Sequence, residues 1–260
     1  MASAVSSLLY AALNTRSDIL WITNKLAKSC SCPGLKDFDA LMHVFGYLRK
    51  YPDNSVKFYG NVEDSPAHEI CRRHKIAPTD IIGFSDTSWQ DCPDTGRSTC
   101  GYKAFVQGGI VDAQSTMPVP VALSSPEAEY MGACLLGAMA CHLRDLMYDF
   151  EFLGTEEFDI DGRTKSIPSV LLVDNQATVR MSKNYKVTGK NRHVGRRWNF
   201  VRRGVQDKLF ELHWIPAEDQ LADDCTKTQP AHKSQPHVDR TLIKIPDMVK
   251  GSKSNVVGNR

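Results

Sequence analysis

Four acidic residues stand among apolar neighbours, where a carboxylate has poor access to water. Asp86 ends a short apolar run that begins at Ile81, and Asp174 directly follows another apolar run. Glu129 and Asp223 are likewise set beside apolar residues. A lone carboxylate in such a place is costly unless it is paired, hydrogen-bonded or bound to a cation. The four acids therefore predict a site for divalent metal ions.

The chemistry of such a site follows from its ligands. Carboxylate oxygens are the hard ligands that Mg²⁺ prefers, and the ion keeps coordination places for water and phosphate. Two ions held in this way can activate an attacking water and stabilise the leaving oxygen of a phosphodiester displacement. The pattern predicts phosphodiester hydrolysis without a nucleophilic side chain.

A basic segment follows the third of these acids. No carboxylate occurs between Asp174 and Asp207, although the formal net charge of the 260 residues is only +2. Positive residues accumulate there instead: Arg180, Lys183, Lys186, Lys190, Arg192, Arg196, Arg197, Arg202 and Arg203. A basic face beside a carboxylate cluster is typical of a protein that binds phosphates. A solvated charged helix would explain the positive charge but not the missing acids.

The elements that must position the acids alternate between strands and helices. Periodicity predicts strands over Asp80–Trp89, Gly101–Val106, Gly109–Ala113, Ser169–Val173 and Leu209–Ile215. Helices are predicted from Ser125 to about Phe152, over Gln176–Lys183, over about His193–Val205, and from Pro216 with Asp223 one turn in. The order predicts an α/β fold whose sheet has an antiparallel three-strand meander and two further strands. Neighbouring parallel strands would then set Asp86 and Asp174 side by side.

Three regions are predicted along the chain. Residues 1–77 form a mainly helical segment with two helices, a break at Ser31-Cys32-Pro33-Gly34 and a short strand over Val56–Tyr59. Residues 78–228 form the α/β domain. Residues 229–260 are a polar tail that we expect to be disordered.

Other classes of protein and site are disfavoured. No apolar run approaches the roughly 20 residues that span a bilayer, and the first ten residues lack the basic region of a secretory signal. We therefore expect a cytoplasmic or nuclear protein without a membrane partner, whose eight scattered cysteines are reduced. A zinc site is disfavoured because the spacing of its candidate ligands matches no compact zinc module. Those candidates are Cys30, Cys32, His68, Cys71 and His74.

Five motifs together resemble the ribonuclease H domain of Ty1/copia-type retrotransposon polyproteins. They are Ser85-Asp86-Thr87-Ser88-Trp89, Arg97-Ser98-Thr99-Cys100-Gly101-Tyr102, Val121-Ala122-Leu123-Ser124-Ser125-Pro126-Glu127-Ala128-Glu129-Tyr130, Val173-Asp174-Asn175-Gln176-Ala177 and Asp219-Gln220-Leu221-Ala222-Asp223. These motifs fall in the family's order and cover about Thr79 to Lys227. Earlier motifs are similar to the segment that links polymerase to ribonuclease H in those polyproteins: Ser7-Leu8-Leu9-Tyr10, Arg16-Ser17-Asp18-Ile19, Asn24-Lys25-Leu26 and Tyr47-Leu48-Arg49.

The resemblance implies a ribonuclease H-like fold and endonucleolytic cleavage of the RNA strand of RNA/DNA hybrids. It further implies two Mg²⁺ ions, with Mn²⁺ as an alternative, held by Asp86, Glu129, Asp174 and Asp223. Glu127 competes with Glu129, which we prefer because Glu-Tyr-Met-Gly fits the family's pattern. The expected partners are the hybrid and, as a further candidate, a reverse transcriptase polymerase domain. Candidate nucleic-acid contacts are Asn175, Lys183, Lys186, Lys190, Arg192, Arg196 and Arg197.

Departures from the family's pattern leave a second hypothesis open. The segment His193-Val194-Gly195-Arg196-Arg197-Trp198-Asn199-Phe200 lacks an acid and a histidine that the family usually shows, and Asp224 and Cys225 replace residues that tend to be apolar. The alternative is a catalytically silent, host-adopted module that binds nucleic acid or supports assembly with the same fold. An integrase-type nuclease ranks far lower, because its acids would occur in a different order.

Overall fold

The computed structural model describes residues 1–152, 167–184, 195–228 and 238–244. Its strands are β1 (Asn54–Ser55), β2 (Ile81–Ser88), β3 (Thr99–Val106), β4 (Gly109–Thr116), β5 (Ser169–Val173), β6 (Phe210–Trp214) and β7 (Ile243–Lys244). Its α-helices are α1 (Ala2–Asn14), α2 (Leu20–Lys28), α3 (Leu35–Lys50), α4 (Pro66–Arg73), α5 (Ser125–Asp149), α6 (Gln176–Lys183) and α7 (Gly195–Gln206). Short 3₁₀ helices cover Ser17–Ile19, Val62–Asp64, Ala217–Asp219 and Asp223–Cys225. Within these residues no helix is long and apolar enough to cross a membrane.

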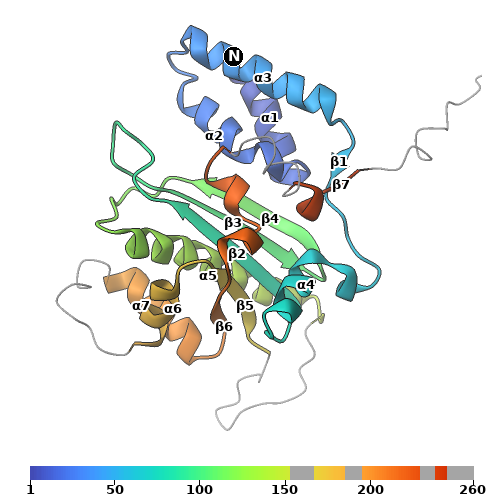
Figure 1. Cartoon of the computed structure of the whole chain (residues 1–260), viewed down its shortest axis with the longest axis vertical. Coiled ribbons are helices and arrows are strands. Elements are labelled where there is room, and N and C mark those ends of the chain that lie inside the picture. The colour runs from blue at the N-terminus through green and yellow to red at the C-terminus, as the bar shows by residue number, and fades with distance from the viewer. Residues whose placement is uncertain (153–166, 185–194, 229–237, 245–260) are drawn as a thin grey trace, which may run out of the picture.

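The centre of the molecule is a five-stranded mixed sheet of order β4-β3-β2-β5-β6 (Figure 1). β2, β3 and β4 are antiparallel neighbours, whereas β5 pairs in parallel with both β2 and β6. Five of the strands predicted from the sequence form this sheet, and they follow one another along the chain as predicted. The meander followed by two further strands confirms the ribonuclease H-like fold class.

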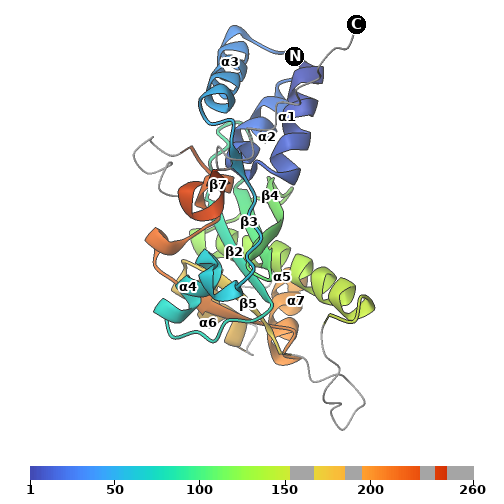
Figure 2. The same cartoon turned by 90° about the vertical axis from the view of Figure 1, so that its right-hand side faces the viewer.

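Helices cover the sheet on both faces, because side chains of successive strand residues point to opposite sides. On one face α5 and α7 bury a cluster that includes Tyr130, Leu136 and Val201. On the other face α4 and the segment 216–228 contribute to a second cluster (Figure 2). In β2 the alternation is plain, since Ile81 belongs to the first cluster and Ile82 to the second.

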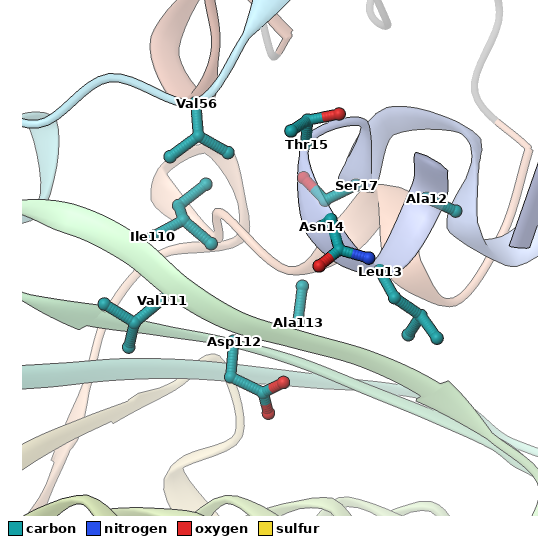
Figure 3. Close-up of a pocket in the computed structure, with 10 residues that line it drawn as sticks. All are labelled: Ala12, Leu13, Asn14, Thr15, Ser17, Val56, Ile110, Val111, Asp112 and Ala113. Carbon is teal, nitrogen blue, oxygen red and sulfur yellow. The ribbon is translucent and has the colours of Figure 1, made fainter. Parts of the chain in front are cut away.

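Helices α1 and α2 pack on the outer strand β4. A bulge in β4 leaves Val111 unpaired, because Ala104 pairs with Asp112 and Phe105 with Ile110. Figure 3 shows the result: Ile110 and Ala113 lie on the side that faces α1, and Asp112 points away. The cavity left between α1 and β4 measures about 10 Å³, room for roughly one water. This contact is therefore closely packed.

The second buried cluster crosses the predicted boundary at residue 77. It joins Val5, Leu20 and Leu41 of the helical region to Phe84 and Cys225 of the α/β region. The division into residues 1–77, 78–228 and 229–260 stays a prediction. The helical region nevertheless shares its core with the elements that carry two of the four acids.

Three local predictions are corrected. The predicted strand over Val56–Tyr59 is wrong, because the strand here is β1, which pairs with β7 at Lys244. The first predicted helix is two helices, α1 and α2, separated at Arg16, whose guanidinium binds Asp18. The last predicted helix is a pair of 3₁₀ turns, because Gln220 between them has an extended backbone.

The prediction of a disordered tail lies mostly outside the described residues. Within it, β7 pairs with β1, and Val238 and Leu242 are buried. Arg240 donates a hydrogen bond to the backbone oxygen of Glu218. Part of the segment 229–260 therefore packs against the α/β region.

Candidate metal centre

Two parallel strands bring the first pair of acids together. β2 and β5 are in register with Ser85 opposite Val173, so the next residues are Asp86 and Asp174. The carboxyl ends of parallel neighbours meet at one edge of the sheet, which is where open α/β sheets place their ligand sites. The predicted juxtaposition of these two acids is confirmed by this register.

Helix α5 supplies the third acid. Ser124 caps the helix by accepting a hydrogen bond from the Glu127 amide, and Pro126 follows in the first turn. Gly132 lets the helix approach β2 closely, since a Cβ there would lie 2.6 Å from Thr87 Oγ1. This close contact places Glu129 against the end of β2, where it is 6% exposed.

One group of potential metal ligands occurs in the described part of the chain. It consists of Asp86, Glu129 and Asp174, each with one oxygen within 4.8 Å of the other two. Glu127 does not belong to it, because its Oε2 accepts a hydrogen bond of 2.9 Å from the Leu123 amide at the helix start. The geometry therefore sets Glu129, rather than Glu127, beside the strand ends.

Asp223 reaches the site from the C-terminal turn and lies outside this group of three. Gly101 of β3 permits the approach, since a Cβ there would lie 2.6 Å from the Cβ of Cys225. Gln220 ties the same segment to β2 by donating a hydrogen bond of 2.8 Å to the backbone oxygen of Ser85. Asp219 accepts a hydrogen bond from Arg73 of α4 and pairs with His74, which follows that helix. These contacts hold Asp223 near Asp86.

Burial makes the cluster electrostatically costly. Burial, together with the charges of Asp86 and Asp174, raises the pKa of Glu129 to about 10. Burial also raises the pKa of Asp86 to about 6, although Lys227 and the Thr226 hydroxyl lower it. The pKa of Asp174 is raised by burial and lowered by Lys227. Like charges confined in a poorly hydrated place favour either protonation or a bound cation.

The donor set fits a divalent metal. All candidate ligands are carboxylate oxygens, which suit Mg²⁺ or Mn²⁺. Glu129 Oε2 is buried and has no hydrogen-bond partner among the described atoms. A buried carboxylate oxygen without a partner is costly, and a cation would satisfy it.

Replacing Glu129 with glutamine is expected to stabilise the protein in EDTA at neutral pH. The folded protein keeps the Glu129 proton up to a pKa of about 10, whereas an unfolded glutamate loses it near its ordinary value. Unfolding therefore becomes progressively more favourable as pH rises from about 4.5, and Glu129→Gln removes this effect. The gain should be near zero at pH 4.5 and should grow by about 1.4 kcal/mol per pH unit, to about 4 kcal/mol at pH 7.5.

Thermal unfolding of both proteins in EDTA across this pH range tests that expectation. Added Mg²⁺ should stabilise the wild type more than Glu129→Gln. Parallel stability curves for the two proteins over the whole range would contradict the raised pKa of Glu129.

The candidate nucleic-acid contacts are only partly described. Lys183 is exposed at the end of α6, and Arg197 is partly buried in α7. Asn175 caps α6 by accepting hydrogen bonds from the amides of Ala177 and Thr178, so its side chain has a structural partner. Lys186, Lys190 and Arg192 lie outside the described residues, as does the side chain of Arg196.

Four residues around the acids have partners that sequence reasoning did not foresee. The Thr226 hydroxyl donates a hydrogen bond to Asp86 Oδ2. Lys227 Nζ lies 2.5 Å from Asp223 Oδ1. Fully buried Lys103 of β3 pairs with Asp224 at 2.7 Å. The only local signal was the i,i+4 spacing of Asp223 and Lys227, and it gives no hint of the contact with Asp86.

The disfavoured zinc ligands do not form a group of possible ligands among the described residues. His74 Nε2 lies 2.7 Å from Asp219 Oδ2, and the Cys30 thiol points to the backbone oxygen of Leu26. Cys71 is buried in the second cluster, and burial raises the pKa of its thiol to about 12. His74, Cys30 and Cys71 therefore serve local pairing and packing.

The chain is similar in sequence to known polyproteins and in structure to solved proteins, although no protein-family model matches it. The Pol polyprotein of transposon TNT 1-94 from Nicotiana tabacum is 26% identical over 232 residues, 89% of this chain. That of transposon RE2 from Arabidopsis thaliana is 25% identical over 223 residues, 86% of this chain. The chain spans about one seventh of each polyprotein, 15% and 14%.

Solved structures of ribonucleases H are more distant. The crystal structure of LC11-RNase H1 in complex with RNA/DNA hybrid is 16% identical and has a TM-score of 0.37, covering 56% of this chain and 93% of that one. Because this TM-score is low, the fold class rests on the strand order and register of the sheet.

Proposed function

We propose that the α/β domain of this chain, whose homologues are Pol polyproteins of Ty1/copia-type retrotransposons, is a ribonuclease H. The proposed reaction is endonucleolytic hydrolysis of the RNA strand of an RNA/DNA hybrid. The observation that carries the proposal is the meeting of Asp86, Glu129 and Asp174 within 4.8 Å of one another. Three buried or partly buried carboxylates this close together are costly without a cation, and such perturbed groups are typical of functional sites.

The proposed ligands of two Mg²⁺ ions are Asp86, Glu129, Asp174 and Asp223, and Mn²⁺ is a chemically similar substitute. When bound, such ions provide positive charge at the phosphate and lower the pKa of water. The chain's own part is to hold the ligand oxygens in place. Thr226 fixes one oxygen of Asp86 through its hydroxyl, and close packing of Gly132 on β2 keeps Glu129 at the strand end.

The proposed substrate contacts belong to α6 and α7. Exposed Lys183 and partly buried Arg197 would attract the phosphates of the DNA strand. Selection of RNA would come from contacts to 2′-hydroxyl groups across the wide minor groove. A reverse transcriptase polymerase domain is a proposed second partner, because the similar polyproteins are retrovirus-related.

The test is cleavage of a hybrid whose RNA strand carries a label, in Mg²⁺ and in EDTA. We expect the hybrid to be cleaved in Mg²⁺ but not in EDTA. Matched RNA/RNA and DNA/DNA duplexes should not be cleaved in either. Cleavage of all three duplexes would contradict the hybrid specificity. Equal binding of the hybrid in Mg²⁺ and in EDTA, with no cleavage, would support the catalytically silent binding module instead.

A further inference from the structure

Lys227 lies between two of the four acids. Its Nζ is 2.5 Å from Asp223 Oδ1 and 3.7 Å from Asp86 Oδ2. The Lys227 side chain is half exposed, whereas the Asp86 carboxylate is buried. One ammonium group therefore bridges a carboxylate of the central strand and a carboxylate of the C-terminal turn.

The backbone that carries Lys227 is fastened to the sheet. Thr226 donates its hydroxyl hydrogen bond to Asp86, and Asp224 pairs with buried Lys103. Lys227 extends beyond these anchors on a flexible four-carbon stem. Its ammonium group can thus leave the acids while the backbone stays in place.

The structure also provides space for the displaced side chain. A cavity of about 390 Å³ lies beside Lys227, between the C-terminal turn and the helices α2 and α3. Lys227, Asp224 and Thr228 line one side of it, and Trp21, His43 and Tyr47 line the other. A lysine side chain that turned away from Asp86 would find room here or in solvent.

We propose that Lys227 is a tethered counter-ion shared by Asp86 and Asp223 until a divalent cation displaces its ammonium group. The inference rests on the proposed function, because it takes Asp86 as a metal ligand. An ammonium group and a divalent cation on the same buried carboxylate repel each other strongly, since little water screens them. The apparent association constant for the metal is then the intrinsic constant multiplied by the fraction of molecules in which Lys227 has moved away.

Lys227→Gln tests this competition because it removes the charge and keeps most of the side-chain length. We expect the variant to bind Mg²⁺ about 3–10 times more tightly than the wild type, measured by calorimetry without nucleic acid. In EDTA its thermal unfolding midpoint should fall, because Asp86 and Asp223 lose their counter-ion. Lys227→Arg, which keeps the charge, should stay close to the wild type in both measurements.

An exposed lysine of α3 provides the matched control, since Lys36→Gln removes the same charge elsewhere and should change neither quantity. Unchanged or weaker Mg²⁺ binding by Lys227→Gln, beside a wild type that binds, would overturn the inference and leave the proposed function intact. Binding of Mg²⁺ by neither protein would remove the metal site and overturn both.

Discussion

Asp174→Asn is expected to lower Mg²⁺-dependent cleavage of an RNA/DNA hybrid about a thousandfold or more. The substitution keeps the shape of the side chain but removes an anionic oxygen from the group that also contains Asp86 and Glu129. Losses of 10²–10³ are typical when one electrostatic group of a preorganised site is removed, and a metal ligand should cost at least as much. The rate should be measured with saturating hybrid, so that weaker binding does not mimic slower chemistry.

The fold of this variant should persist. Asp174 follows β5 without a described side-chain hydrogen bond to the core, and its removal relieves repulsion among buried acids. We therefore expect its unfolding midpoint in EDTA to equal or exceed that of the wild type. Asp145→Asn, an exposed site on α5, is the matched control and should cleave normally. Activity within tenfold of the wild type in Asp174→Asn would exclude Asp174 as an essential ligand.

Lys103→Met is expected to destabilise the protein by about 3–5 kcal/mol, because it leaves a carboxylate unpaired in a buried place. Lys103 is fully buried, and its Nζ lies 2.7 Å from Asp224 Oδ2. Burial lowers the pKa of Lys103, but Asp224, together with Cys225 and Asp18, raises it by more, so the net shift is upward. The charged Lys103 therefore contributes its full stabilisation at pH values below the ordinary lysine pKa of about 10.4. This stabilisation is lost only as pH rises through the raised pKa of the folded state.

A double-mutant cycle separates the pair from the packing around it. Asp224→Leu alone should also be costly, since it leaves the Lys103 ammonium unpaired in the core. The double variant Lys103→Met with Asp224→Leu should recover most of the loss, because apolar side chains of similar size commonly replace a buried ion pair without penalty. Urea unfolding of the four proteins measures the coupling. Additive losses would show that the two side chains contribute independently.

This pair explains one departure from the family's pattern. Asp224 stands where the resemblance leads one to expect an apolar residue, and the structure places it against a lysine 121 residues earlier in the chain. The pair fastens the turn that carries Asp223 to β3. For the same reason, Lys103→Met should weaken Mg²⁺ binding as well as stability.

The sequence by itself determined the order of the elements and most of the acid cluster. Apolar runs that end at Asp86 and Asp174 predict two strands with acids at their carboxyl ends, and the parallel register of β2 and β5 follows that prediction. The cap at Ser124 fixes where α5 begins and hence which turn carries Glu129. These features depend on periodicity and caps within a few residues, which local sequence contains.

Only the tertiary structure decided how the cluster is held and neutralised. Thr226 reaches Asp86 across 140 residues, and Gln220 reaches Ser85 across 135. Asp223 lies on a 3₁₀ turn rather than the predicted α-helix, because Gln220 before it has an extended backbone and donates a side-chain hydrogen bond to β2. The physical reason is that hydrogen bonds and ion pairs between distant segments depend on how those segments pack. Residue type and local spacing do not determine that packing. The contact of Lys227 with Asp86 is therefore seen only in the folded structure, where the sheet and the C-terminal turn meet.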